Sequence, residues 1–217
     1  RQEIIDALGG GDIPTGLFAK NFSFNGDQKI VYDVDKAKEE FKQAGYSYNG
    51  DKLVDKDGNN VKLSILTYSA KPDLPIIGQV LVSDLEQVGI EATVRLADSI
   101  DEEAAKGDYD ILLYAQNPTA SGNPHYFFAQ HFKTGSVKNH SYYGNEEVDK
   151  LIDELGVTTD LAKRDELSKE IQAKIYEDLP ILYTVDPHWF VMLSDKVKGY
   201  EIWNGDYFVT NPTLKVR

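Results

Sequence analysis

The chain has 217 residues, of which 41% are hydrophobic and 27% are charged, and its formal net charge is -13. This composition predicts a folded globular chain that is large enough for one sizeable α/β lobe. The acidic balance argues against nucleic acid and anionic membranes as partners. Because cysteine is absent, disulfides and thiolate metal sites are excluded.

The first half of the chain alternates helical and strand patterns. Asp33 is expected to cap one helix, and glycines are expected to end three of them. The expected helices lie at residues 1–8, 34–44, 75–88 and 99–106. An Asp-Gly pair at residues 57–58 predicts a β-hairpin, and the strand, helix, strand order predicts parallel pairing. The expected strands lie at residues 52–54, 61–68, 90–96 and 109–114.

The second half begins with a polar loop and continues with two longer helices. The apolar spacing predicts these helices at residues 146–155 and 160–178, and Pro180 stops the second. Three apolar runs then predict strands or extended segments at residues 181–185, 189–193 and 197–203. Because the sequence opens on what reads as the last turns of a helix, we expect an excised part of a larger protein.

Residues 108–145 form the stretch that we expect to face a ligand. It opens as a buried strand, passes through a loop rich in Asn, Pro, Ser and Gly, and ends in a run with many aromatic residues. Three of the four histidines of the chain lie in it. An open α/β sheet binds its ligand beyond the carboxyl ends of the strands, so this stretch is a candidate binding edge.

Uncharged polar, aromatic and imidazole side chains are the candidate ligand contacts of this stretch. They are Gln116, Asn117, Thr119, Ser121, Asn123, His125, Tyr126, Asn139, His140 and Tyr142. Imidazole is a common ligand of nickel-type metals. His125, His131 and His140 are therefore metal candidates, and His140 and His125 are preferred. The alternative is structural: polar groups that stabilise turns, and histidines and tyrosines that serve the core.

Several blocks of the sequence, taken in order, resemble the extracellular solute-binding proteins of peptide and nickel ABC importers, family 5. They are DVDKAKEEFKQAGY, VGIEATV, DYDILLYAQNP, NPHYFF, EEVDKLIDEL and KRDELSKEIQAKIYEDLPILY. The NPHYFF block is most similar to the nickel or metallophore branch, where an Asp-Pro-His sequence follows the same strand. Asn123 replaces that Asp here. The peptide binders commonly carry an acidic residue in this loop, whereas none lies between Asp110 and Asn145.

The resemblance implies a periplasmic-binding-protein-like (type II) lobe, an α/β fold with a mixed sheet flanked by helices. Residues 1–217 would form a single lobe, the carboxyl-terminal half of a two-lobe protein whose amino-terminal lobe is missing from this chain. That protein would be an extracytoplasmic monomer, periplasmic or lipid-anchored, which delivers its solute to an ABC permease in the membrane. The implied solute is nickel or another transition metal bound as an organic chelate, with no cofactor required. An oligopeptide is the alternative.

Two other classes of function are alternatives to a solute-binding protein. A small hydrolase or transferase would need a clustered nucleophile and base, and the sequence contains no Gly-x-Ser-x-Gly elbow. An adaptor domain without a small ligand would bury the loop at residues 116–126 under its own chain. We therefore expect a binding protein that is not an enzyme.

Overall fold

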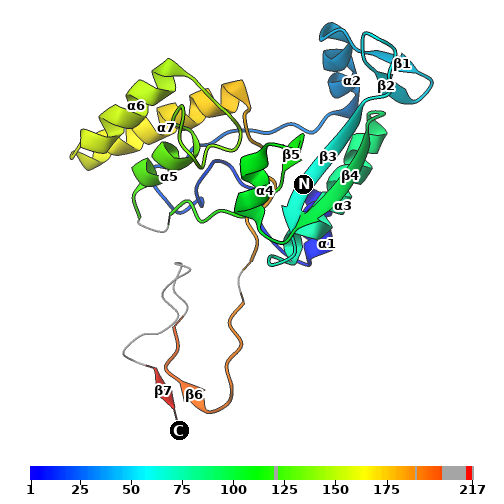
Figure 1. Cartoon of the computed structure of the whole chain (residues 1–217). Helices are drawn as coiled ribbons and strands as arrows, with labels where there is room; N and C mark the ends of the chain where they lie inside the picture. Colours follow the sequence, from blue (N-terminus) through cyan, green and yellow to red (C-terminus); the bar gives the residue numbers. More distant parts are fainter. Residues whose placement is uncertain (120–121, 189, 202–213, 217) are drawn as a thin grey trace. The chain divides into compact units, whose positions relative to one another are not determined.

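The computed structural model describes residues 1–119, 122–188, 190–201 and 214–216 (Figure 1). The chain divides into two compact units. The first comprises Arg1–Thr15 and Asp27–Ala115, and the second comprises Gly16–Gly26 and Gln116–Arg217. Among the described residues, no helix is both long enough and apolar enough to cross a membrane.

The first unit contains a three-stranded parallel sheet. In the order β4, β3, β5, its strands are Glu91–Ala97, Lys62–Tyr68 and Ile111–Leu112. Helix α3, Asp73–Gln87, connects β3 to β4 and packs along both strands, as a parallel crossover requires (Figure 1). Helix α1, Gln2–Leu8, packs on α3, and helix α4, Ile100–Lys106, packs on β3.

A two-stranded ribbon and helix α2, Val34–Gln43, complete the first unit. Strands β1, Ser47–Asn49, and β2, Lys52–Val54, pair antiparallel. The turn between α3 and β4 packs against this ribbon at Gly89, whose φ is 83°. A Cβ at Gly89 would lie 2.5 Å from the Asp51 carbonyl oxygen, so only glycine fits this turn.

The second unit is built around three helices. They are α5, α6 and α7, at Pro124–His131, Glu146–Val157 and Leu161–Asp178. Helix α6 packs against both of the others, and the apolar faces meet in one core. Phe18 packs edge to face against Phe24, Phe127 and Phe128 inside this core. Further along the chain, two short strands pair antiparallel: β6, Val197–Lys198, and β7, Lys215–Val216.

A buried side chain of α7 fixes residues 16–26 to the second unit. Gln172 is 1% exposed. Its Oε1 accepts the backbone amides of Leu17 and Gly26 at 3.1 and 3.0 Å, and its Nε2 donates to the Phe24 carbonyl at 2.7 Å. A Cβ at Gly16 would lie 2.8 Å from Gln172 Oε1. A larger residue would therefore clash with α7 at this position, and glycine allows the close approach.

The α/β class and most of the predicted helices are confirmed. The described three-stranded sheet is parallel throughout, and the antiparallel pairs form separate ribbons rather than extending it. The prediction of a hairpin around residues 57–58 is wrong, because β2 forms its ladder with β1 and not with β3. Across that turn the chain forms an isolated bridge between Val54 and Asn60 and single backbone hydrogen bonds, such as the one from the Val61 amide to the Leu53 carbonyl at 2.9 Å, but no ladder. The strand expected at residues 109–114 shortens to β5.

The strands expected after Pro180 are wrong over most of their length. Residues 181–185 and 190–193 form no strand, and the third run keeps only β6. Apolar composition suggested strands there, but a strand also needs a ladder partner. Trp189 and residues 202–203, which belonged to these predictions, lie outside the described residues.

Candidate functional site

Helix α5 begins at a cap that is anchored to two other helices. Asn123 Oδ1 accepts the His125 backbone amide at 3.0 Å, and Pro124 lies in the first turn. Arg164 of α7 donates from Nη2 to the same oxygen at 2.5 Å and from Nη1 to the Leu155 carbonyl at 3.0 Å. Asn123, a predicted ligand contact, therefore fixes the start of α5.

His125 packs its ring against helix α6. A Cβ at Gly156 would lie 2.7 Å from His125 Nε2, so the imidazole fills the space that this glycine leaves. Burial lowers the pKa of His125, and the nearby Arg164 and Lys133 charges lower it further. The position of Nε2 against Gly156 supports the structural interpretation of His125 more than its role as a metal ligand.

Asn139 organises the loop at residues 132–145. Its amide nitrogen donates to the Lys133 and Tyr143 carbonyls at 3.2 and 2.7 Å. Its Oδ1 accepts the Ser141 hydroxyl at 3.0 Å and the Tyr143 amide at 3.2 Å. The side chain is 7% exposed. With both donors and both acceptor positions used, Asn139 shapes the loop and has no hydrogen-bonding capacity left for a solute.

The carboxyl end of this loop is tied to the end of α7. Asp178 Oδ2 accepts the Tyr143 hydroxyl at 2.6 Å and the Asn145 side-chain amide at 2.9 Å. These hydrogen bonds lower the pKa of Asp178, whereas burial and the Asp178 carboxylate raise the pKa of Tyr143. Asn145 Oδ1 also caps α6 by accepting the Glu147 and Val148 amides. Two helices therefore hold the loop end.

Tyr142 and Tyr126 are the candidate aromatic residues that face solvent. Tyr142 is 71% exposed and Tyr126 is 55% exposed. The backbone of Tyr142 has φ of 54°, a left-handed conformation that costs a large side chain more than it costs glycine. An exposed ring held in this conformation by a fixed loop is suited to stack on a solute.

The polar candidates before α5 occupy a turn. Asn117 Oδ1 accepts the Thr119 backbone amide at 3.2 Å, which is local turn chemistry. Gln116 is exposed. Ser121 lies outside the described residues. Gln116, Asn117 and Thr119 belong to the same unit as α5 and its loop, but each keeps both a structural and a ligand-binding interpretation.

His131 and His140 are close enough for the charge of one to act on the other. His131 Nδ1 lies 3.2 Å from the Lys138 carbonyl oxygen, and its ring centroid lies 4.8 Å from that of Phe127. Burial lowers the pKa of His131, and the Lys138 and His140 charges also lower it. His131 was not one of the two preferred metal candidates, and its contact with Lys138 depends on how the loop closes, which residue spacing does not show.

The chemistry of this site is that of imidazoles, amides and exposed tyrosine rings. Across residues 1–119, 122–188, 190–201 and 214–216, no three histidine or carboxylate side chains come together as a metal cluster. Residues 111–144 contain no carboxylate. Such a surface can complete the coordination of a metal that arrives with its own ligands, or bind uncharged groups.

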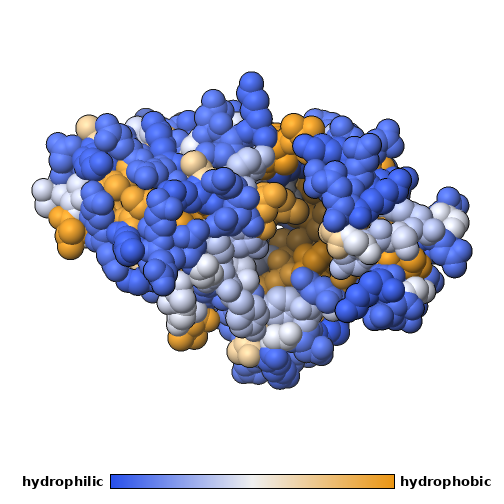
Figure 2. Space-filling model, turned by 90° about the horizontal axis from the view of Figure 1, so that it is seen from above, coloured by the Kyte–Doolittle hydropathy of each residue, from blue (hydrophilic) through white to orange (hydrophobic). Residues whose placement is uncertain are grey.

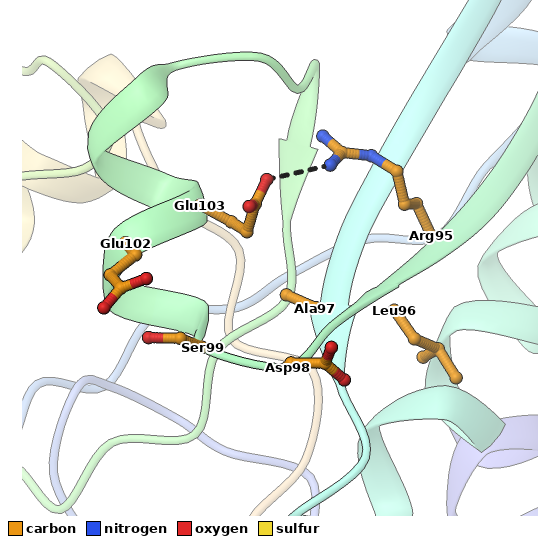
Figure 3. Close-up of a pocket in the computed structure, with 7 residues that line it drawn as sticks. All are labelled: Arg95, Leu96, Ala97, Asp98, Ser99, Glu102 and Glu103. Carbon is orange, nitrogen blue, oxygen red and sulfur yellow. Dashed lines mark hydrogen bonds and ion pairs between the residues drawn. The ribbon is translucent and has the colours of Figure 1, made fainter.

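The first unit has a shallow pocket of about 370 Å³ at the carboxyl end of β4 (Figure 3). Arg95, Asp98, Ser99, Glu102 and Glu103 contribute its polar lining. Arg95 is already paired with Glu103 at 3.2 Å (Figure 3). None of the predicted site residues lines this pocket.

The surface of the chain agrees with its composition. Figure 2 shows hydrophilic side chains over most of the face that is drawn, with hydrophobic ones in smaller patches. This is the surface expected from a chain of formal net charge -13. The imidazoles of α5 and its loop are thus weakly basic groups on an acidic protein.

Comparison with protein families gives one match that covers more than half of the chain. Residues 1–139 match the bacterial extracellular solute-binding proteins, family 5 Middle. Among curated proteins, the chain is 31% identical to the nickel-binding protein NikA of Staphylococcus aureus over 155 residues. This alignment covers 69% of the chain and 32% of that protein. The chain is also 25% identical to the oligopeptide-binding protein AppA of Bacillus subtilis, over 93% of the chain and 39% of AppA.

Solved structures give the same picture of the fold. A nickel ABC transporter protein from Bacillus halodurans matches with a TM-score of 0.81 and 27% identity, over all of this chain and 46% of that one. NikA from Staphylococcus aureus, in complex with Ni(L-His)2, matches with a TM-score of 0.81 and 24% identity, again over 46% of its chain. The present chain thus spans about a third to just under half of the length of these relatives.

Proposed function

Since this chain belongs to the bacterial extracellular solute-binding proteins of family 5, a non-catalytic family, we propose that its protein binds nickel or another transition metal as an organic chelate. The protein would act outside the cytoplasm as the substrate-binding component of an ABC importer and deliver the chelate to a membrane permease. We also propose that residues 1–217 form its carboxyl-terminal lobe and that the amino-terminal lobe completes the solute site.

The observation that carries this proposal is the chemistry of residues 111–144. This stretch holds three histidines and no carboxylate. Imidazole is a good ligand for nickel, whereas a peptide amino terminus is most readily paired with a carboxylate. The 31% identity to NikA of Staphylococcus aureus, a protein named for nickel binding, supports the same choice.

The partial coordination available in this unit favours a chelate over a bare ion. In the described part of the chain, no three metal-binding side chains converge, so most ligands would have to come with the metal. Exposed Tyr142 and Tyr126 offer apolar ring faces to the organic part of such a complex. The related structure of NikA in complex with Ni(L-His)2 is of this kind.

An oligopeptide is the second candidate solute. It is supported by the match to AppA of Bacillus subtilis, whose structure in complex with a nonapeptide has a TM-score of 0.81 against this chain. The exposed amide of Gln116 and the tyrosine rings suit a peptide backbone as well as a chelate.

Calorimetric titration of the full-length protein distinguishes the two solutes. Separate titrations would use nickel alone, nickel with L-histidine, and a mixed peptide pool. We expect heat with nickel and L-histidine, and little heat with peptides. Heat with the peptide pool alone would reject the chelate and support the second candidate.

A further inference from the structure

The imidazole of His131 is oriented by a hydrogen bond that leaves one defined ring nitrogen as its acceptor. Its Nδ1 lies 3.2 Å from the Lys138 carbonyl oxygen. A carbonyl oxygen can only accept a hydrogen bond, so Nδ1 must carry the hydrogen. In the neutral ring, the lone pair that can bind a metal is therefore on Nε2.

Packing keeps this ring in place. Phe127 lies one helical turn before His131 on α5, with ring centroids 4.8 Å apart and planes inclined by 43°. The loop that supplies the Lys138 carbonyl is fixed near its start, where the Ser136 hydroxyl donates to the Gln130 carbonyl at 2.6 Å. A preset ring loses little orientational freedom when it binds.

His131 Nε2 is not occupied within the described part of the chain. Among these residues the ring makes its hydrogen bond through Nδ1. His131 is partly buried rather than fully buried. Burial and the neighbouring Lys138 and His140 charges lower the pKa of His131, which keeps the imidazole in the neutral form that metals bind.

We propose that His131 Nε2 is a direct ligand of the metal in the bound chelate, with His140 as the imidazole beside it. The arrangement is the one that protein metal sites commonly use, in which a ligating histidine donates its other ring N–H to a backbone carbonyl. His125, by contrast, places Nε2 against Gly156 of α6. This inference deepens the proposed function and rests on it.

Two variants of the full-length protein separate the ligand role from a packing role. His131→Asn keeps a donor near the position of Nδ1, for the Lys138 carbonyl, and removes Nε2. His125→Ala is the matched control, since it removes an imidazole of the same helix. We expect His131→Asn to weaken binding of nickel with L-histidine by about tenfold or more, and His125→Ala to change it by less than about threefold.

Proton NMR of the histidine rings, with aqueous Ni²⁺ added to the full-length protein, gives an independent readout. Paramagnetic broadening should affect the His131 ring signals first, then those of His140, and leave those of His125 and His188 sharp. Broadening at His131 without heat from nickel and L-histidine would reject the proposed function and retain the imidazole site. Heat without broadening at His131, and with unchanged affinity in His131→Asn, would overturn the inference and retain the function.

Discussion

The side chains of the loop at residues 132–145 are of two kinds. Some hold the loop in shape through hydrogen bonds, and others are exposed to solvent. Asn139 and Tyr143 point inward and are held by hydrogen bonds. His140 is partly exposed and Tyr142 is 71% exposed. Asn139 was predicted as a ligand contact. The hydrogen-bonding groups of its side-chain amide are all used within the loop, which supports a role in holding the loop in shape. Within this loop, His140 and Tyr142 would then be the residues that contact the solute.

Replacing Asn139 with Asp isolates the contribution of its two donors. Asn139→Asp keeps the oxygen that the Ser141 hydroxyl and the Tyr143 amide bind, but it leaves two carbonyls facing a carboxylate. We expect the free energy of unfolding to fall by about 2–4 kcal/mol. Urea denaturation measures this change. Ser141→Ala, which removes one hydrogen bond of the same network, should cost no more than about 1.5 kcal/mol, and equal losses in the two variants would contradict the positioning role.

Replacing Tyr142 with Gly tests whether its backbone strain serves binding. Glycine adopts φ of 54° without the Cβ penalty, so Tyr142→Gly should not destabilise the fold and could raise the free energy of unfolding by up to about 1 kcal/mol. The same change should weaken chelate binding, because the exposed ring is lost. Denaturation and calorimetry on the same protein provide both values. A variant that is more stable and binds as well as the parent would remove Tyr142 from the site.

Among the secondary-structure elements, α7 does the most to assemble the second unit. Its buried face packs against α6, and Gln172 and Ser168 on that face bind the Phe24 carbonyl of a segment that lies far away in sequence. Its carboxyl end, at Asp178, holds the loop through Tyr143 and Asn145. The shape of the candidate site therefore depends on a helix that contributes no predicted solute contact.

The Gln172 network should be one of the most sensitive points of the second unit. Gln172→Glu preserves the acceptor for the Leu17 and Gly26 amides but removes the donors to the Phe24 and Ser168 carbonyls and buries a charge. We expect a loss of about 3 kcal/mol or more in the free energy of unfolding. Glu170→Ala, on the exposed side of α7, is the control and should change it by less than about 0.5 kcal/mol. Similar denaturation midpoints for the two variants would mean that residues 16–26 are not held by Gln172.

The elements that the sequence predicted well are those coded by local signals. Asp33 caps α2, and Gly9 and Gly89 end or follow helices, as expected. Pairing was harder to predict, because turn signals lie on both sides of β2. Its ladder forms across the turn at residues 50–51, where Asn49 lies opposite Lys52, and not across the Asp-Gly turn at residues 57–58. The apolar runs after Pro180 have the composition of strands, but most of their described residues have no ladder partner.

The sequence predicted which stretch of the chain holds the candidate site, but it predicted the roles of the individual side chains less well. The Asn-Pro pair at residues 123–124 carried a readable helix-start signal, yet α5 itself was not among the expected elements. The orientation of His131 depends on a carbonyl seven residues away, and the packing of His125 depends on Gly156. Such contacts arise only when the loop and α6 fold together, so residue spacing alone could not rank the three histidines.

At the scale of the whole molecule, the chain is an acidic binding protein whose candidate site is weakly basic. Its formal net charge is -13, while residues 111–144 contain three histidines, two lysines and no carboxylate. Lys133 is paired with Asp153 of α6. The absence of carboxylates from residues 111–144 nevertheless suits a complex that carries carboxylates on its organic part, because this stretch presents no like charge to it.

The pH dependence of the molecule follows from the two histidines whose pKa values are lowered. His131 is affected by burial, Lys138 and His140, and His125 by burial, Arg164, Asp153 and Lys133. A histidine pKa below its unfolded value means that the unfolded chain takes up the proton first. Stability is therefore complete above about pH 6.5 and decreases as the pH falls below it.

Chelate affinity should fall in the same range, because protons compete with the metal for imidazole. Thermal melting and calorimetry from about pH 8 to about pH 5.5 measure both effects. In the variant His131→Asn, the melting temperature should depend less on pH than in the parent. An unchanged pH profile would mean that the His131 ring does not titrate with folding.

The most direct measurement is an anomalous difference map at the nickel absorption edge. It would be recorded from crystals of the full-length protein grown with nickel and L-histidine. We predict one nickel peak within direct bonding distance of His131 Nε2, with His140 adjacent and the remaining ligands supplied by histidine molecules. A nickel peak remote from α5 and its loop, or a bound peptide without nickel in the same place, would contradict the account.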